Sequence, residues 1–140
     1  MIEEIDRYLK DLFPIMRSIT GSGNRKTLKL LQQIVPLSII EFKSGEKVYD
    51  WTIPKEWCPK EAWIKDSMGN TIVDFKENNI HLVGYSYSID KKLYFSELKE
   101  HLFLHTSINE AIPYRTSYYK KAFGFCVTKN QYEKMAKHKG

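Results

Sequence analysis

No apolar run in this 140-residue sequence approaches the roughly 20 residues needed to cross a lipid bilayer. The first six residues, Met1-Ile2-Glu3-Glu4-Ile5-Asp6, are acidic where a secretory signal peptide requires positive charge, and no apolar segment of the signal-peptide type follows. We therefore expect a soluble, cytoplasmic protein that has no membrane partner.

Cysteine is also scarce. The two cysteines, Cys58 and Cys126, lie far apart and form no Cys-x-x-Cys spacing. This pattern argues against a zinc knuckle and against a redox-active pair, and two free thiols fit a reducing compartment.

The usual groupings of reactive side chains are missing as well. Gly21-Ser22-Gly23 precedes a predicted helix, but no predicted strand comes before it and no Gly-Lys-Ser/Thr follows, so we interpret it as a helix-connecting turn rather than a phosphate cradle. His101 and His105 have the spacing at which two imidazoles on a helix can share a metal. The intervening Leu102-Phe103-Leu104 lacks the Glu of a His-Glu-x-x-His site. We expect no catalytic residues and no metal site in this chain.

The composition indicates a folded protein. Hydrophobic residues make up 42% of the chain and aromatic residues 14%, which argues against disorder, and the length suits one compact domain or one domain with a small insertion. The net charge of +5 comes from residues 115–140, where seven lysines and arginines accompany one acidic residue, Glu133. A terminal lysine excess is more often a solvated helix face than a phosphate-binding surface, so we do not expect nucleic acid as the main partner.

The periodicity of residues 1–36 predicts two helices. The first carries an apolar stripe at three- and four-residue steps and should end near Phe13, because Pro14 has no N–H to donate; the stripe consists of Ile2, Ile5, Leu9, Leu12 and Met16. The second helix is expected from an Asn24 cap to about Val35.

Residues 37–94 read as β-rich. We predict a hairpin that pairs residues 37–42 with residues 49–53, a second hairpin that pairs 62–65 with 71–75, and a strand over 80–89. Within that strand, Gly84 indicates a bulge or the close approach of another backbone.

The rest of the chain returns to helix and strand. A helix capped by Ser96 is expected to run to about Leu104, followed by a strand over residues 123–128. Thr128-Lys129-Asn130-Gln131 is a capping box that predicts a last helix.

Residues 111–126 form the densest run of aromatic and hydroxyl side chains in the sequence. The run offers tyrosines, a serine and a threonine, but no base, metal cluster or phosphate loop accompanies them. The chemistry of these residues alone does not assign a reaction.

Three separated motifs carry a family resemblance. They are Leu12-Phe13-Pro14-Ile15-Met16-Arg17-Ser18-Ile19-Thr20-Gly21, Asp50-Trp51-Thr52-Ile53-Pro54-Lys55-Glu56-Trp57, and Ile112-Pro113-Tyr114 with Thr116-Ser117-Tyr118-Tyr119 and Gly124-Phe125-Cys126. In order and spacing the chain resembles the N-terminal part of a bacterial family of aminopeptidase-like proteins, over about residues 5–132. Such proteins are similar to co-catalytic zinc aminopeptidases and carboxypeptidases, with a small inserted β-rich domain and a C-terminal winged helix, and many lie near surface-polysaccharide genes. The chain departs from the family pattern at Met16 and at Ala122-Phe123.

The resemblance implies an α/β fold, seen as α+β within this stretch. Residues 1–49 would be the N-terminal part of a zinc-peptidase-like domain, 50–108 an inserted β-rich subdomain, and 109–140 the return to the main domain. The zinc ligands of such a family, including a His-Pro and Asp-Asn run, would lie beyond residue 140, so zinc is expected for the full-length family and no cofactor for this chain. The residues implied to shape a substrate cleft, by hydrogen bonding and packing, are Arg17, Thr20, Tyr114, Ser117 and Tyr118.

Three functions follow as hypotheses. The first is an N-terminal part of a zinc-dependent aminopeptidase-like protein, inactive alone, whose partners are the remainder of the peptidase domain and a small peptide substrate. The alternative is a stand-alone binding module for glycan, peptide or nucleic acid that uses the aromatic β-rich region and the basic tail. The third is a non-functional remnant with an aggregating or molten fold.

Overall fold

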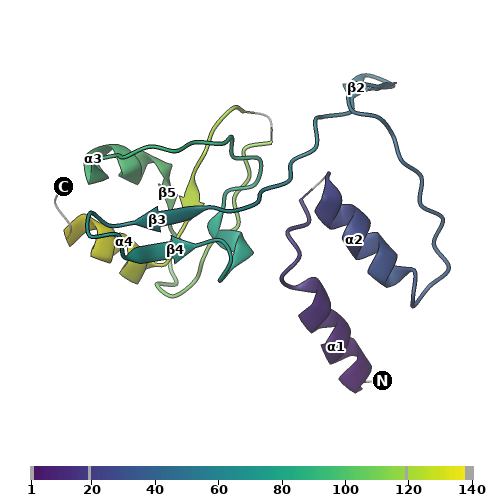
Figure 1. Cartoon of the computed structure of the whole chain (residues 1–140), viewed down its shortest axis with the longest axis horizontal. Helices are drawn as coiled ribbons and strands as arrows, with labels where there is room; N and C mark the ends of the chain where they lie inside the picture. Colours follow the sequence, from purple (N-terminus) through teal and green to yellow (C-terminus); the bar gives the residue numbers. More distant parts are fainter. Residues whose placement is uncertain (1, 19, 119, 138–140) are drawn as a thin grey trace. The chain divides into compact units, whose positions relative to one another are not determined.

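The computed structural model describes residues 2–18, 20–118 and 120–137. The chain divides into two compact units, Met1–Lys60 and Glu61–Gly140. The described residues form four α-helices, two short 3-10 helices and six short strands in three two-stranded sheets (Figure 1). The fold is therefore mixed α and β, as the sequence predicts, and the expected subdomain boundaries at 49/50 and 108/109 stay a prediction. Among the described residues, none of the helices has both the length and the apolar character to cross a membrane.

The first unit begins with α1 (Ile2–Leu12) and α2 (Ser22–Leu31). The predicted first helix is confirmed: the N–H of Phe13 donates to the carbonyl of Leu9 at 2.9 Å, and Pro14, which has no N–H, follows the helix end. The α2 helix starts before the predicted cap, because Gly21, at φ +113°, is its N-cap. The Asn24 side chain donates instead to the carbonyl of Ser18.

The hairpin of the first unit differs from the prediction. Strand β1 (Lys47–Val48) pairs antiparallel with β2 (Trp51–Thr52), and Tyr49 and Asp50 form the two-residue turn between them. Such a turn requires positive φ, and Tyr49 has φ 55°. Residues 37–42 form no strand, so the predicted pairing was wrong, although a turn does lie at Gly45 (φ +89°).

The second unit opens with the predicted hairpin of β3 (Trp63–Lys65) and β4 (Thr71–Asp74), which pair antiparallel. The connecting turn is held by the carboxylate of Asp66, whose Oδ1 accepts the N–H groups of Met68 and Asn70 at 3.0 and 2.9 Å. Val73, on the inner face of β4, is fully buried.

The predicted strand over residues 80–89 was wrong. The segment begins with the 3-10 helix η1 (Asn79–His81) and then makes only isolated bridges, from Leu82 to Phe125 and from Gly84 to Thr116. Tyr85 has φ 65°, which interrupts the extended backbone that alternation requires. The close approach predicted at Gly84 is confirmed, since its N–H donates to the Arg115 carbonyl at 2.9 Å.

The predicted helix to Leu104 is shorter than expected. Its α-helical part, α3 (Phe95–Leu98), has Tyr94 rather than Ser96 as N-cap and continues as the 3-10 helix η2 (Lys99–His101). The chain then extends as β5 (Leu102–Phe103), which pairs in parallel with β6 (Phe125–Cys126). The glycine at position 124 makes this strand pairing possible, because any residue with a Cβ there would place that atom 2.8 Å from the His101 carbonyl oxygen.

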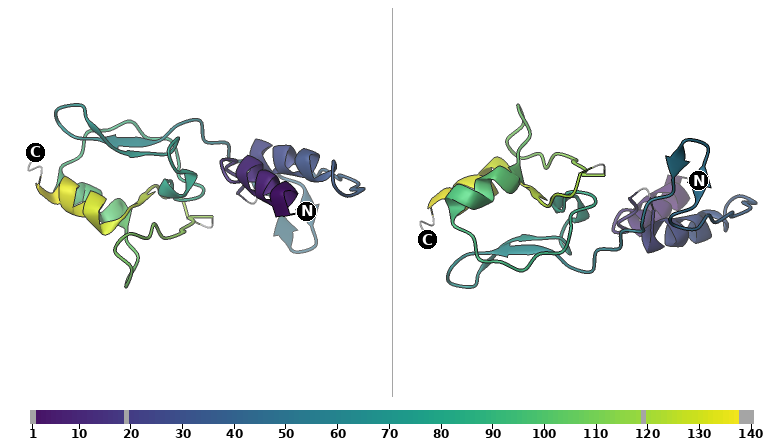
Figure 2. Two further views of the ribbon diagram at one scale, coloured as in Figure 1. Left: turned by 90° about the horizontal axis from the view of Figure 1, so that it is seen from below. Right: turned by 90° about the horizontal axis from the view of Figure 1, so that it is seen from above.

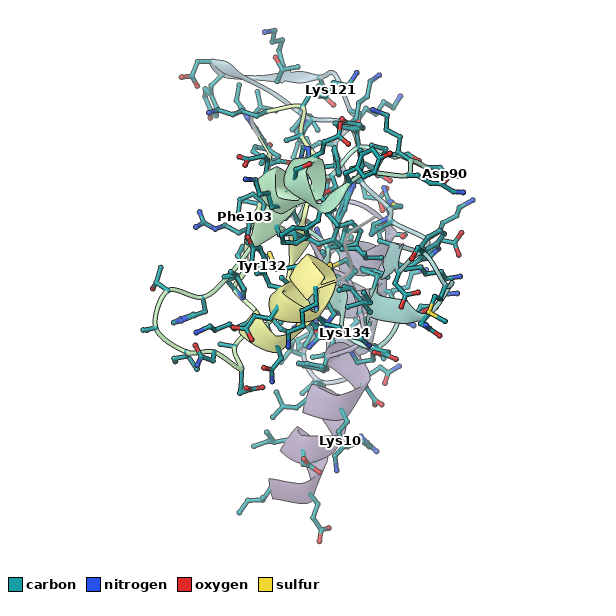
Figure 3. All side chains as sticks on the ribbon, turned by 90° about the vertical axis from the view of Figure 1, so that its left-hand side faces the viewer. Lys10, Asp90, Phe103, Lys121, Tyr132 and Lys134 are labelled. Atoms are coloured by element: carbon teal, nitrogen blue, oxygen red, sulfur yellow. The ribbon has the colours of Figure 1, made fainter. Side chains whose placement is uncertain are left out.

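The last helix, α4 (Lys129–Lys137), begins at the predicted capping box. The N–H of Thr128 donates to Gln131 Oε1 at 2.9 Å, and the N–H of Gln131 donates to Thr128 Oγ1 at 3.3 Å. Figure 2 shows α3 and α4 on one side of the unit and the β3–β4 hairpin on the opposite side. Tyr132, labelled on α4 in Figure 3, packs edge-to-face on Phe95 with ring centroids 5.2 Å apart.

The core of the second unit lies between these elements. Its buried apolar side chains come from β4, from the segment after η1, from β5, from residues 123–127 around β6, and from α4; they are Val73, Leu82, Val83, Leu102, Phe123, Phe125, Cys126, Val127 and Met135. The core holds residues 81–84 and 123–127 against each other, and so fixes the base of the loop that contains residues 111–118.

Candidate functional site

The hydroxyl-rich loop of residues 111–118 is anchored on Gly84. The N–H of Ser117 donates to the Gly84 carbonyl at 2.8 Å, Ser117 Oγ donates to the same oxygen at 3.1 Å, and Thr116 Oγ1 lies 3.4 Å from it. A Cβ at Gly84 would lie 3.3 Å from Thr116 Oγ1, so a glycine suits this crossing of two backbones. Ser117, a predicted cleft residue, thus uses its hydroxyl to hold the loop.

The two predicted tyrosines of this loop differ in exposure. Tyr114 is 68% exposed, whereas Tyr118 is half-buried. The ring of Tyr118 packs edge-to-face on Tyr85, with centroids 4.9 Å apart and an interplanar angle of 82°. The sequence analysis did not identify Tyr85 as a contact of Tyr118, because Tyr85 lies in a segment that we predicted as a regular strand.

Arg17 and Thr20, the other predicted cleft residues, belong to the first unit. Arg17 Nη1 donates to the Leu12 carbonyl at the end of α1, and Thr20 Oγ1 donates to the Lys55 carbonyl at 3.5 Å. Both contacts support the turn between α1 and α2. The structure therefore brings Ser117 and Tyr118 together in one loop, and places Arg17 and Thr20 in the other unit.

A charged cluster in the first unit was missed by the sequence analysis. The Arg25 guanidinium donates through Nε to Glu41 Oε1 at 2.8 Å, through Nη1 to Glu56 Oε2 at 3.1 Å, and through Nη2 to Glu56 Oε1. Hydrogen bonding from Arg25 lowers the pKa of Glu56 below its usual 4.5, and both carboxylates raise the pKa of Arg25. No local pattern predicts a cluster whose members are 16 and 31 residues apart.

The two histidines with metal-site spacing have other roles. His101 Nδ1 lies 3.2 Å from the Phe123 carbonyl oxygen, and its ring stacks on Phe123 with centroids 3.8 Å apart. His105 Nδ1 accepts the N–H groups of Ser107 and Ile108 at 3.2 and 3.0 Å. Across the residues that the structure describes, no three His, Cys, Asp or Glu side chains gather where they could hold a metal ion.

The two thiols lie in different surroundings. Cys58 is exposed, and its Sγ accepts the N–H of Ser22 at 3.3 Å. Cys126 is fully buried, and burial raises the pKa of its thiol to about 11. The raised pKa of the Cys126 thiol is the opposite of the depressed pKa that activates a nucleophilic cysteine.

Comparison with known proteins identifies the family of this chain. A family described as a domain of unknown function (DUF2172) matches residues 56–139. The chain belongs to the DUF2172 family. The match spans the whole described part of the second unit, including the loop on Gly84 and the Tyr85–Tyr118 pair.

A curated relative of this DUF2172 chain comes from Clostridium acetobutylicum and is named "Putative polysaccharide biosynthesis protein with aminopeptidase-like domain". It is 46% identical over 132 residues, which make up 94% of this chain and 30% of the relative. A crystal structure titled as a "putative peptidase" from the same organism matches with a TM-score of 0.89 and 46% identity, over 94% of this chain and 31% of that one. The chain thus spans about a third of the length of the proteins that it matches.

Proposed function

We propose that this chain is a non-catalytic, N-terminal part of a zinc-dependent aminopeptidase-like protein that acts on small peptides. The proposal depends on how much of each protein the match with the Clostridium relative covers. The match includes 94% of this chain at 46% identity, but only 30% of the relative, whose name includes an aminopeptidase-like domain. The described residues also contain no group of three His, Cys, Asp or Glu side chains that could hold a metal ion. We therefore assign zinc to the remaining part of such a protein, and no catalytic step to this chain.

The surface of α1 supports a partner of this kind. The helix has no buried residue, and three residues of its apolar stripe are open to solvent: Ile2 is 84%, Ile5 54% and Leu9 62% exposed. Further exposed apolar side chains follow in residues 34–42. Contiguous exposed apolar surface is typical of an interface. We infer that the stripe packs against the remainder of the peptidase-like domain.

The proposed role of this chain at the active site is to shape the cleft. Tyr114 presents an exposed ring that can pack against a peptide, while Tyr118 and Ser117 are fixed on Gly84 and Tyr85. Arg17 and Thr20, in the first unit, remain predicted cleft residues of the full-length protein. In this proposal residues 1–49 and 109–140 belong to the main domain and residues 50–108 to an inserted subdomain.

The first experiment is to sequence the DNA downstream of the codon for residue 140. An open frame that encodes a His-Pro and Asp-Asn run, with later His and Glu residues, supports the proposal. A stop codon with no such coding sequence in any frame contradicts it, and the stand-alone binding module then becomes the hypothesis to test.

The second experiment measures activity in a hybrid protein. Because identity is 46% and the TM-score is 0.89, this chain can replace the matched part of the Clostridium relative. We expect the hybrid to release leucine from Leu-Gly-Gly, to lose that activity with 1,10-phenanthroline and to regain it with zinc. This chain alone should release nothing. A folded hybrid without activity, beside an active Clostridium protein, would argue against the proposal.

The apolar stripe provides a matched pair of variants for the same hybrid. Leu9→Asp places a charge on the stripe and should lower the amount of folded, active hybrid. Asp11→Asn changes an exposed position on the same helix and should leave the hybrid unchanged. Equal behaviour of the two variants would show that the stripe is not an interface.

A further inference from the structure

Two residues other than glycine have positive φ in the described chain, Tyr49 at 55° and Tyr85 at 65°. Tyr49 lies in a two-residue hairpin turn and is 99% exposed. Tyr85 is the third residue of a turn over residues 83–86, closed by the Ser86 N–H, which donates to the Val83 carbonyl at 3.1 Å. Glycine or asparagine normally takes that position when φ is positive, so a tyrosine there is an outlier.

The surroundings of Tyr85 impose this conformation from both sides. On one side, the Gly84 N–H donates to the Arg115 carbonyl at 2.9 Å, and the Gly84 carbonyl accepts the Ser117 N–H at 2.8 Å. On the other side, Ser86 Oγ donates to the Val83 carbonyl at 2.7 Å and accepts the Gly124 N–H at 3.2 Å. Strained backbone persists only where the surrounding structure over-determines it, and such residues cluster at functional sites.

The strained backbone at Tyr85 determines where the Tyr85 side chain lies. The left-handed backbone brings the Tyr85 ring into an edge-to-face contact with Tyr118, at a centroid distance of 4.9 Å. A glycine would relieve the backbone but could not contact Tyr118. An edge-to-face pair restricts both rings, so the orientation of Tyr118 depends on the turn at Tyr85.

We propose that Tyr85 is a positioning residue, which the turn keeps in the left-handed conformation so that its ring fixes Tyr118 for contact with the peptide substrate. Only the substrate part of this statement rests on the proposed function. The positioning of Tyr118 is testable in the chain itself.

Three variants of the full chain separate the ring from the backbone. Tyr85→Phe keeps the ring, Tyr85→Ala removes the ring and keeps the strain, and Tyr85→Gly removes both. The Tyr118 ring is followed by 19F NMR of fluorotyrosine-labelled protein, with its resonance assigned through Tyr118→Phe. Thermal unfolding is measured in parallel.

We expect the Tyr118 resonance to stay in place in Tyr85→Phe and to shift in both other variants. Alanine retains the backbone strain and glycine does not, so the melting temperature of Tyr85→Ala should be lower than that of Tyr85→Gly. The strain of one left-handed residue other than glycine lowers the melting temperature of a small domain by about 4 °C or more. A Tyr118 resonance that does not move in Tyr85→Gly overturns the proposal. Equal midpoints for Tyr85→Ala and Tyr85→Gly also overturn it, because the backbone would then carry no strain.

The substrate part is tested in the hybrid protein, with Leu-Gly-Gly as the probe. Tyr85→Gly should raise KM several-fold and leave kcat unchanged, Tyr85→Phe should restore the native KM, and Tyr49→Gly, the matched relief of strain in the hairpin turn, should change neither constant. An unchanged KM in Tyr85→Gly removes the substrate role. If the native hybrid is inactive, the proposed function fails, and the NMR and melting data still decide whether Tyr85 positions Tyr118.

Discussion

His81 Nδ1 lies 2.7 Å from the carbonyl oxygen of Cys126, in the interior of the second unit. A carbonyl oxygen only accepts, so Nδ1 must carry the proton, and Nε2 is left as the acceptor. Gln131 Nε2 lies 3.4 Å from that acceptor and also donates to the Ile72 carbonyl at 3.3 Å. One buried histidine, 3% exposed, therefore links β4, β6 and the first turn of α4.

Removing this histidine should destabilise the second unit. In His81→Ala the Cys126 carbonyl loses its donor and a cavity forms, for which we expect a loss of about 2–4 kcal/mol in the free energy of unfolding. In His81→Asn the shorter amide can still donate to the carbonyl, so the loss should be smaller. Urea denaturation followed by NMR signals of the second unit measures both. Equal losses would show that packing, rather than the hydrogen bond, sets the cost.

Cys126 should resist modification under conditions in which Cys58 reacts. Burial raises the Cys126 pKa from 9.0 to about 11, so its thiol is protonated at neutral pH and is also covered. At pH 8 a thiol reagent such as DTNB should titrate one thiol rapidly, and the rapid phase should vanish in Cys58→Ser. Two equally fast thiols in the native chain would contradict the burial of Cys126.

The same pKa implies a dependence of stability on alkaline pH. Because the folded pKa is higher than 9.0, the stabilising contribution of the protonated thiol is complete below about pH 9 and is lost as the pH rises through about 11. Cys126→Val should have a flatter stability profile between pH 9 and 11. Thermal midpoints across this range measure the effect, with Cys58→Ser as the control that keeps the native slope.

The Arg25 cluster should give the first unit an acid-sensitive contribution. Since Arg25 lowers the pKa of Glu56, the contribution is present above the usual value of 4.5 and is lost as the pH falls through the lower folded value. Glu56→Gln should flatten the acid limb of the stability profile, and added salt should weaken the native effect because the pair is exposed. Asp6→Asn, which breaks the isolated pair with Lys10 on α1, is the matched control. NMR titration of the Glu56 carboxyl measures the pKa directly, and a value at or above 4.5 would contradict the structure.

Two glycines should differ in their tolerance of alanine. A Cβ at Gly124 would lie 2.8 Å from both the His101 carbonyl oxygen and Phe103 Cε2, so Gly124→Ala should cost about 1–3 kcal/mol. At Gly84 the nearest atom would be Thr116 Oγ1, at 3.3 Å, and a shift of that side chain by a few tenths of an ångström can make room. Gly84→Ala should therefore cost less. Urea denaturation of the two variants gives the order, and the reverse order would be incompatible with this packing.

The elements that the sequence predicts well are those set by neighbouring residues. The α1 stripe, the stop at Pro14, the β3–β4 hairpin and the Thr128–Gln131 capping box all depend on side chains within a few positions of one another. Their periodicity and turn chemistry are present before any tertiary contact forms.

The elements that were predicted wrongly depend on partners that are distant in sequence. The helix expected through Leu104 becomes β5 because Phe125 and Cys126 offer a parallel strand, and Gly124 lets that backbone approach His101. The strand expected over residues 80–89 is broken at Tyr85 because Gly84 is held by the loop at Ser117. Hydrogen bonds to a remote backbone outweighed local preference in both cases.

The candidate site divides in the same way. Sequence motifs alone determined the family resemblance and directed attention to Tyr114, Ser117 and Tyr118, since motif order needs no coordinates. Only the tertiary structure decided that Ser117 is bound to Gly84 and that Tyr118 packs on a strained Tyr85, because 33 residues separate each pair and no local pattern encodes such a contact.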